Sequence, residues 1–521
     1  MHAMKNNKMS THCQLSNDEM TLSIIYYIIR PNFTFTKRTR TQSPASVHFL
    51  SLTMNKVELF FISTSLKGHI VSMEQLAKLL VHQNSRLSIT VLIIKSPLET
   101  NTTPYDQPVH DRIRFIYLSP PQNQNHDLGH HRLAEIHKPL VKEAVTTTIT
   151  SSNDSVLAGF VIDMFCTTMI DVANELGVPS YMFFTSGAAT LSLCFHLQAL
   201  HDFQNIDITE FNGSNAELPA PYFRNPVPAK VLPSPFLHKD SAADSFQLTR
   251  RFRETKGIMV NSFMELESHA LNSLSSDPQI PPVYPVGPVL NLQTDGQDQC
   301  SDIMKWLDDQ APLSVVFLCF GSMGSFGEDQ VKEIACALEQ SGHRFLWSLR
   351  KPPPKGTMSS PTDYSNLEEV LPEGFLDRTN GIGKVIGWAP QVEILAHSAI
   401  GGFVSHCGWN STLESIWFGV PIAAWPMFAE QQLNAFQLVV ELGLAVEIKM
   451  DYRKDWMMGN EPIVSSEEIK RGIMAVMEED SDIRKKVKDM SEKSRTASVI
   501  GGGSSHSSLR RFIADVMDNI Q

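Results

Sequence analysis

The sequence lacks long apolar runs, paired cysteines and an excess of basic charge, and each absence argues against a class of protein. The longest early apolar run, residues 22–29, is too short to cross a membrane, and no other segment is long and apolar enough. The formal net charge is −12, which disfavours a nucleic acid as the partner. The seven cysteines are scattered without a CxxC pair, so we expect free thiols in a reducing compartment, the cytoplasm.

Two nucleotide-binding motifs are also missing. There is no GxxxxGK[ST] segment, and no GxGxxG follows the first predicted strand, which disfavours a P-loop ATPase and a dinucleotide dehydrogenase. The glycines at 501–503 precede a late helix, where they cap and bend the chain. No group of His, Cys, Asp and Glu has the spacing of a metal site, so we expect neither a metal nor another cofactor.

Residues 1–53 differ in composition from the rest of the chain. They mix Ser, Thr, Asn and basic residues around one short apolar run, and a well-formed predicted strand begins just after Met54. We expect Met54 to be the real start, with residues 1–53 a disordered or gene-model extension. A plastid transit peptide is the alternative, because the stretch is rich in Ser and Thr, basic, and poor in acidic residues.

From residue 57 onward, predicted strands alternate with predicted helices. The strands are expected at 57–62, 87–95, 113–118, 156–162, 181–184, 257–260, 315–320, 344–349, 384–388, 402–405 and 421–425. This alternation predicts an α/β protein with two doubly wound, Rossmann-like domains that face each other across a cleft. We place an N-terminal domain at 54–288, a linker at 289–300, a C-terminal domain at 301–502 and a last helix at 503–521. Ligands of such sheets bind at the carboxyl ends of the strands.

The segment from Trp388 to Gln431 carries the strongest functional signal. A predicted strand runs into the polar turn HCGWNS, and a helix follows. Free backbone N–H groups and the helix dipole favour an anion at such a helix start, and a diphosphate would fit there. Simpler explanations exist for single residues: Trp388 could be a half-buried core residue, and Asn410 and Ser411 could cap the helix.

Two residues of the N-terminal half are candidates for acid–base chemistry. His69 ends the first loop after a strand, and Asp163 closes the strand at 156–162, so both lie at carboxyl ends. An imidazole in a cleft can take a proton from a hydroxyl near neutral pH. A carboxylate bound to the far ring nitrogen would fix its tautomer and stabilise the imidazolium. A structural role is the alternative for a single histidine.

Taken together, these segments resemble a known family. The stretch from Trp388 to Gln431 resembles, without a gap, the signature box of plant secondary-product UDP-glycosyltransferases of glycosyltransferase family 1. The segments KGIMVNSFMELESHALNSL and PPVYPVGPVLNL are similar to members that act on flavonoids, terpenoids and other small phenols or alcohols. The resemblance extends from residue 57 to the C-terminus. It implies the GT-B fold, with the donor on the C-terminal domain, the acceptor on the N-terminal domain, and a last helix that returns to the N-terminal domain.

The resemblance also implies a role for each matching residue. His69 and Asp163 would form the catalytic dyad, and Phe165 and Cys166 are expected in the acceptor pocket. The matching donor-binding residues are Trp388 and Gln391 at the uracil, Ser322, His406, Asn410 and Ser411 at the diphosphate, Glu414 at the ribose, Glu430 and Gln431 at the hexose, and Thr185 near the sugar. Trp409 is a further expected donor-binding residue. In the family, Gln at the last position of the box goes with glucose and His with galactose.

We therefore expect an inverting, metal-independent transferase. It would move glucose from UDP-glucose to a hydroxyl of a small lipophilic plant metabolite and give a β-O-glucoside. A nucleotide-sugar epimerase or hydrolase on the same fold and a non-catalytic nucleotide-sugar sensor are the alternatives. We expect a monomer with no nucleic acid partner and no membrane span. One departure from the family pattern is the first loop, where Ser-Thr-Ser-Leu-Lys precedes Gly68; we expect Lys67 to point to solvent rather than to the diphosphate.

Overall fold

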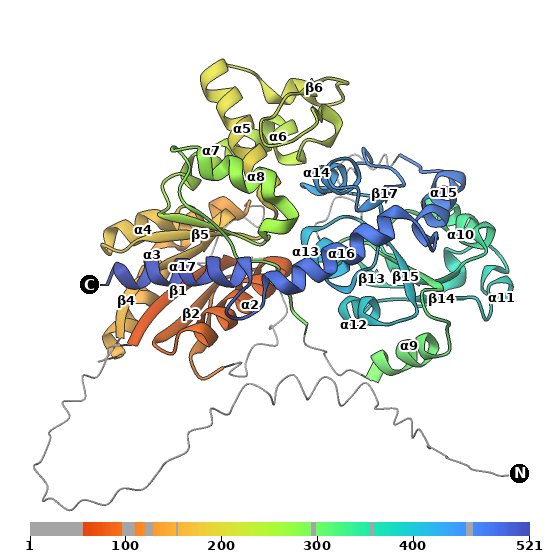
Figure 1. Ribbon diagram of the computed structural model, residues 1–521, viewed down its shortest axis with the longest axis horizontal. Helices are drawn as coiled ribbons and strands as arrows, with labels where there is room; N and C mark the ends of the chain where they lie inside the picture. Colours follow the sequence, from red (N-terminus) through yellow and green to blue (C-terminus); the bar gives the residue numbers. More distant parts are fainter. Residues whose placement is uncertain are drawn as a thin grey trace, which may run out of the picture. The chain divides into compact units, whose positions relative to one another are not determined.

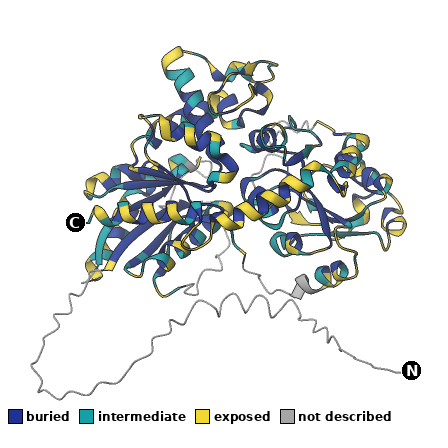
Figure 2. Cartoon of the chain, in the orientation of Figure 1, coloured by how far each residue is buried: buried dark blue, intermediate teal, exposed yellow. Residues whose placement is uncertain are grey.

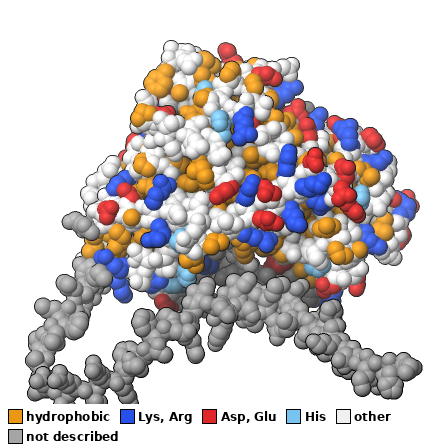
Figure 3. All heavy atoms as spheres, viewed as in Figure 1, with side chains coloured by type: hydrophobic (Ala, Val, Ile, Leu, Met, Phe, Trp, Pro, Cys, Tyr) orange, Lys and Arg blue, Asp and Glu red, His pale blue; other side chains and the backbone are white. Residues whose placement is uncertain are grey.

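The computed structural model describes residues 56–95, 110–119, 129–152, 155–292, 298–354, 359–454 and 462–520. Residues 54–521 form one compact unit, and the proposed extension at 1–53 lies outside the described residues. In the described part of the chain, none of the helices combines the length and the apolar character that a membrane span needs. On the face seen in Figure 3, acidic and basic side chains are interspersed.

The N-terminal half is built on a seven-stranded sheet of order β3-β2-β1-β4-β5-β8-β9 (Figure 1). All neighbouring strands in this sheet are parallel. The strands are β1 (Lys56–Thr64), β2 (Leu87–Ile94), β3 (Ile113–Leu118), β4 (Ser155–Asp163), β5 (Ser180–Phe184), β8 (Gly257–Val260) and β9 (Val283–Pro285). Strand β1 is buried at every residue except the first, as expected of a strand covered on both faces. The strand order reverses between β1 and β4, and such a switch point is where open α/β sheets bind ligands.

Helices cover both faces of this sheet, and a further group extends from it. The helices are α2 (Lys67–Gln83), α3 (His130–Ser151), α4 (Met169–Glu175), α5 (Ala188–Gln204), α6 (Ser234–Leu237), α7 (Lys239–Phe252) and α8 (Met264–Ser276). Short elements lie among them: the 3-10 turns η1 (Met164–Cys166), η2 (Ile208–Phe211) and η3 (Ala229–Val231), and the paired strands β6 (Glu217–Leu218) and β7 (Val227–Pro228). Figure 1 shows α5, α6 and β6 grouped together, away from the strands β1 and β2.

The C-terminal half repeats the architecture with a six-stranded parallel sheet of order β14-β11-β10-β15-β16-β17. Its strands are β10 (Val315–Cys319), β11 (Arg344–Ser348), β14 (Gly383–Ile386), β15 (Ile400–Ser405), β16 (Ile422–Ala424) and β17 (Ala445–Glu447). Its helices are α9 (Asp298–Asp308), α10 (Glu328–Ser341), α11 (Phe375–Arg378), α12 (Gln391–Ala396), α13 (Trp409–Phe418), α14 (Gln431–Phe436), α15 (Ser466–Met477) and α16 (Asp482–Ala497). A 3-10 turn η4 (Leu367–Glu369), a π-helical turn η5 (Gln437–Glu441) and the antiparallel pair β12 (Arg350–Lys351) and β13 (Thr362–Asp363) complete it.

The last helix, α17 (Ser504–Asp518), packs on the N-terminal half although the chain has just left the C-terminal half (Figure 1). Its side chains Leu509, Phe512 and Val516 are buried in the core under β1. The Tyr181 hydroxyl of β5 donates to Asp515 at 2.6 Å. Figure 2 shows the result: the central strands of both sheets are mostly buried, and the helices are exposed on their outer faces. The expected fold class, including the returning helix, is confirmed.

Candidate active site

The carboxyl ends of β1 and β4 bring His69 and Asp163 together. His69 lies in the first turn of α2, and Asp163 is the last residue of β4. One oxygen of the buried carboxylate accepts the N–H of Phe165 at 2.9 Å, and the other lies 2.5 Å from His69 Nδ1. Because a carboxylate only accepts, the proton belongs on Nδ1 and Nε2 keeps its lone pair. The imidazole stacks on the ring of Phe165 with 5.3 Å between centroids.

Opposing effects act on the pKa of His69. Burial lowers the pKa, whereas the charge of Asp163, the hydrogen bond to it and the charge of Glu430 raise it, and the net pKa lies above 6.5. The side chain remains 21% exposed, so the ring is open to a ligand. Thr185, which follows β5, is buried with Oγ1 at 3.4 Å from Nδ1. This arrangement can hold a proton on the imidazole during a reaction.

In the C-terminal half, α13 begins directly after β15 and a turn in which Cys407 has a φ of 59°. The N-cap is Gly408, and no side chain caps the helix. Asn410 and Ser411 lie inside the first turn, so the alternative that they serve as caps is wrong. The first N–H groups of this ten-residue helix therefore have no side-chain acceptor at the cap and, together with the dipole, suit an anion.

His406 lies just before this helix start and differs from His69 in its surroundings. Its ring is so close to Gly321 and Gly408 that a Cβ on either would come within 2.6 Å of Nε2. Burial alone lowers its pKa to about 4, and Nδ1 has no hydrogen-bond partner in the described part of the chain. A buried polar atom without a partner is costly unless a ligand supplies one.

Trp388 presents an exposed ring near the end of β14. Its side chain is 44% exposed, which is unusual for so large an aromatic residue. Lys67 Nζ lies 4.5 Å from the ring centre and Arg350 Cζ lies 5.1 Å from it. Lys67 is exposed to solvent, as expected, and the negative face of the indole also attracts its charge across the two halves.

Gln391, Ser411 and Glu414 form a hydrogen-bonded group beside that ring. The Gln391 Nε2 amide donates to Ser411 Oγ at 2.9 Å and to Glu414 Oε2 at 2.6 Å. Burial raises the pKa of Glu414 to about 7; the hydrogen bond from Gln391 lowers it and the charge of Glu393 raises it further. A carboxylate in this setting gains from hydroxyl donors, which a ribose offers.

Glu430 is the N-cap residue of α14, and Gln431 is the first residue of this helix. The Gln431 Oε1 atom accepts the N–H groups of Met427 and Phe428 at 3.0 and 3.1 Å, which orients its Nε2 amide as the remaining donor. Glu430 Oε1 lies 3.5 Å from the hydroxyl of Ser186 in the N-terminal half. Its charge also raises the pKa of His69. Glu430 therefore lies next to the dyad, and the two halves meet there.

Comparison with known proteins identifies the family. A family model described as UDP-glucoronosyl and UDP-glucosyl transferase matches residues 282–484. UDP-glycosyltransferase 71A15 of Malus domestica is 58% identical over 88% of this chain and 98% of its own length. Anthocyanidin 3-O-glucosyltransferase 1 of Manihot esculenta is 55% identical over 86% of this chain and 100% of its own length. The chain belongs to the UDP-glycosyltransferase family.

Solved structures place the same fold around a nucleotide. A transferase of Siraitia grosvenorii in complex with UDP has a TM-score of 0.81 at 51% identity and covers 89% of this chain and 100% of its own. A Medicago truncatula enzyme in complex with UDP-glucose has a TM-score of 0.77 at 41% identity, over 89% and 99% of the two chains. The GT-B architecture and the glycosyltransferase class expected from the sequence are confirmed. The alternative of an epimerase or hydrolase is not supported.

Three of the predicted site residues of this UDP-glycosyltransferase have surroundings that the sequence analysis did not anticipate. The indole of Trp409 is buried where the two halves meet, and its Nε1 donates to the carbonyl oxygen of Asn261 at 2.6 Å, so this N–H is not available to a donor. The Asn410 amide donates to the carbonyl oxygen of Gly68 at 3.2 Å. Cys166 is fully buried, and burial raises the pKa of its thiol well above the ordinary value. A fully buried thiol does not fit the expected place in an acceptor pocket.

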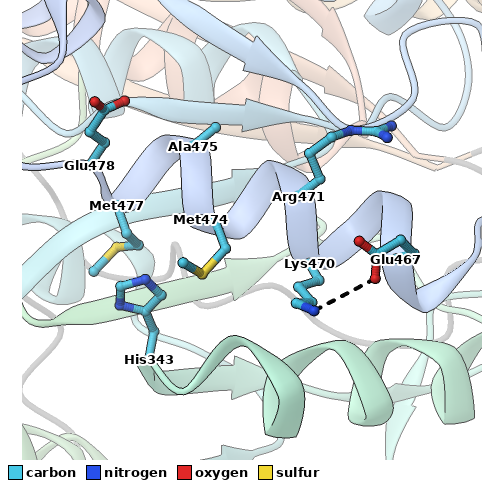
Figure 4. Close-up of a pocket in the computed structure, with 8 residues that line it drawn as sticks. All are labelled: His343, Glu467, Lys470, Arg471, Met474, Ala475, Met477 and Glu478. Atoms are coloured by element: carbon cyan, nitrogen blue, oxygen red, sulfur yellow. Dashed lines mark ion pairs between the residues drawn. The ribbon is translucent and has the colours of Figure 1, made fainter.

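The other predicted residues are distributed as follows. Ser322 is exposed in the turn after β10, and Phe165 supports the His69 ring. Among the described residues, no group of His, Cys, Asp and Glu could hold a metal ion. A surface hollow along α15 is lined by other residues, among them His343, Arg471 and Met474 (Figure 4), so it is not the donor site.

Sequence reasoning missed Glu267 of α8. Its carboxylate is buried and accepts the N–H groups of Ala188 and Ala189 and the Nε2 amide of Gln437, each at 2.8 Å. It thereby caps α5 next to Thr185 and ties this helix to the C-terminal half. The run MELESHALNSL is typical of a helix with its acids in solvent. In this structure the helix has a kink at Glu267, with φ −124° and ψ 38°, and the Glu267 side chain is buried. No pattern in the sequence predicts that kink.

Proposed function

We propose that this enzyme transfers glucose from UDP-glucose to a hydroxyl of a small lipophilic plant metabolite, with inversion, to give a β-O-glucoside. The observation that carries the proposal is the His69–Asp163 pair, oriented with Nε2 free and adjacent to Glu430 of the other half. Relatives named for flavonoid and anthocyanidin glucosylation support the class of acceptor. The neighbour in complex with UDP-glucose supports the donor.

The donor would lie along the carboxyl edge of the C-terminal sheet. Uracil would stack on the exposed ring of Trp388 beside Gln391, and Glu414 would accept the ribose hydroxyls. The diphosphate would take the backbone N–H groups at the start of α13, with His406, Ser411 and Ser322 as further donors. Trp409 would contribute its backbone N–H, and Asn410 its amide. Glu430, Gln431 and Thr185 would then contact the hexose.

The reaction follows from the dyad. His69 Nε2 takes the proton of the acceptor hydroxyl, and the oxygen forms a bond to C1 of glucose from the face opposite the diphosphate. The bond between C1 and the phosphate oxygen breaks, and UDP leaves with the electron pair. Asp163 stabilises the imidazolium that forms. The helix start and the neutral His406 stabilise the charge on the departing diphosphate, a task that needs no metal ion in this scheme.

The proposal extends to the state and place of the enzyme. We expect a monomer in the cytoplasm, because the site uses residues of a single chain and the cysteines suit a reducing compartment. Light scattering of the purified protein and imaging of a fluorescent fusion that begins at Met54 check these two points. Activity that persists in excess EDTA would agree with the metal-free scheme.

The decisive experiment is an acceptor panel of flavonoids, terpenoids and simple phenols with UDP-glucose, read by mass spectrometry. We expect a mass gain of one hexose on at least one acceptor, with the β configuration in the NMR spectrum of the product. A parallel incubation without acceptor should leave UDP-glucose largely intact. Rapid consumption of the donor without acceptor, or an α-linked product, would contradict the proposal.

A further inference from the structure

A short segment of the C-terminal half, residues 451–454 after β17, contacts the N-terminal half through hydrogen bonds. Arg453 in this segment donates through Nη1 to Ser234 Oγ at 2.6 Å, and through Nη2 to the carbonyl oxygens of Lys230, at 2.8 Å, and Leu232. These acceptors lie on η3 and at the start of α6, in the chain between α5 and α7. One guanidinium thus fixes three points of the N-terminal half.

The same part of the N-terminal half also holds the turn before α14. The N–H of Ser234 donates to the carbonyl oxygen of Ala429 at 2.9 Å. Ala429 has a φ of 59°, in the left-handed region that residues with a Cβ rarely adopt. Such a conformation persists only where its surroundings hold it. It directs the two residues that follow, Glu430 and Gln431.

The other flank of this pair is tied to the same segment. Gln432 is fully buried, and its Nε2 amide donates to the carbonyl oxygen of Tyr452 at 2.7 Å. Its Oε1 atom lies 3.5 Å from Arg453 Nη1. Glu430 and Gln431 are therefore anchored on both sides by residues 452–453, directly through Gln432 and indirectly through Ser234.

The chemistry of arginine suits this task. Burial lowers the pKa of Arg453 to about 10, with the charge of Asp451 acting in the opposite direction, so the group stays charged at neutral pH. The acceptors of its hydrogen bonds are neutral carbonyl, hydroxyl and amide oxygens. A planar guanidinium has five donors on three nitrogens and can reach acceptors that lie apart, whereas a lysine has three donors on a single nitrogen.

We propose that Arg453 is a positioning residue for sugar recognition: it holds the turn Ala429–Gln432 in the shape that aims Glu430 and Gln431 at the hexose. The inference rests on the proposed function, because it takes these two residues as the hexose contacts. Arg453 does not itself touch the donor in this scheme. Its loss should therefore weaken discrimination between sugars while it spares the grip on UDP, which belongs to Trp388 and α13.

The test is Arg453→Met, a variant of similar length without donors. Calorimetry gives Kd for UDP, and kinetics give kcat/KM for UDP-glucose and UDP-galactose with one acceptor. We expect the preference for UDP-glucose to fall about tenfold, the size of one lost buried hydrogen-bonding group. The Kd for UDP should stay within about twofold of the wild type.

Arg484→Met is the matched control. Like Arg453, Arg484 donates to three oxygen atoms of other residues. In this case all three are backbone carbonyl oxygens, those of Gly401, Val476 and Glu478, at 2.8, 3.0 and 3.2 Å. These acceptors lie near the start of β15, at the opposite end of the strand from His406. Arg484→Met should lower the melting temperature but leave the sugar preference unchanged. Arg453→Lys, which keeps the charge, serves if Arg453→Met does not fold, and should lose an intermediate share of the preference.

Two outcomes separate the inference from the function on which it rests. If Gln431→His alters the sugar preference but Arg453→Met and Arg453→Lys do not, the positioning role is wrong and the hexose site stands. If Arg453→Met weakens UDP binding as much as it weakens UDP-glucose use, the residue supports the fold in general and the inference is overturned. If Gln431→His changes nothing, the proposed hexose site itself is wrong.

Discussion

The two halves of the molecule each place a histidine beyond the carboxyl end of a central strand, and their surroundings drive the two pKa values in opposite directions. His69 follows β1 and pairs with Asp163, so its pKa lies above 6.5 despite burial. His406 follows β15 and has no acidic partner among the residues that the structure describes, and burial lowers its pKa to about 4. The same side chain is thus prepared to gain a proton in one half and to stay neutral in the other.

This contrast agrees with the different roles that we propose for the two histidines. A base must hold a proton while the acceptor attacks, and a carboxylate at 2.5 Å supplies the compensating charge. A group beside a leaving diphosphate needs only to donate a hydrogen bond. A permanent positive charge there would also bind the product UDP more tightly. The neutral His406 between Gly321 and Gly408 meets this requirement.

The largest expected effect comes from His69→Ala. Removal of a general base should lower kcat by about 10²–10⁴-fold, while Kd for UDP stays near the wild-type value because the proposed nucleotide site lies in the other half. Calorimetry with UDP and a rate assay with a phenolic acceptor measure the two quantities. A variant that glucosylates the phenol at the wild-type rate would remove His69 from the mechanism.

Asp163→Asn should change both the rate and its pH dependence. The amide no longer compensates the imidazolium, so kcat should fall by about 10- to 100-fold. Burial lowers the pKa of His69, and without the charge of Asp163 the charge of Glu430 remains to raise it. The pKa of His69 should therefore fall. Since the neutral imidazole is the active form, the acidic limb of the kcat profile should move to lower pH. The profile is measured at a saturating concentration of UDP-glucose, so that Glu414, whose pKa is about 7, is occupied by the donor and its titration does not affect the comparison. An acidic limb at the wild-type position would contradict the pairing.

His406→Ala should weaken donor binding and leave the pH profile unchanged, in contrast to Asp163→Asn. The loss of one hydrogen bond to the diphosphate should raise KM for UDP-glucose and Kd for UDP by about tenfold. The acidic limb of the pH profile should not move, because a group with a pKa of about 4 is already neutral at the pH of the assay. His397→Ala is a suitable control, since this histidine lies 3.2 Å from Asp308 outside the site. A shifted acidic limb in His406→Ala would show that the two histidines are not separated in function.

Local pattern was enough to predict most of the fold and the framework of the site. Apolar runs alternating with helical segments predicted both parallel sheets, and positions at strand ends predicted that His69 and Asp163 would approach each other. These inferences succeed because they depend on neighbours in sequence and on the rule that parallel strands share a carboxyl edge.

Contacts between the halves could not be predicted in the same way. The indole of Trp409 lies against Asn261, the ammonium of Lys67 over Trp388, and the guanidinium of Arg453 against Ser234. Each partner is distant in sequence, and each contact depends on how two separately folded sheets dock. A single sequence carries no periodic signal for such docking, so residues that look like surface charges or helix starts turn out to join the halves.

The smallest expected effect, and the finest test of the division between the halves, is Gln431→His. Gln431 accepts two backbone N–H groups through Oε1, and in the proposed site its Nε2 contacts the sugar. An imidazole can replace either function but not both in the same geometry, so the turn should relax and the preference should shift from UDP-glucose toward UDP-galactose by about two- to tenfold. A donor competition assay reads this shift directly. The pH profile set by His69 should stay unchanged, because residue 431 acts on the donor and not on the base. An unaltered sugar preference would remove Gln431 from recognition of the hexose.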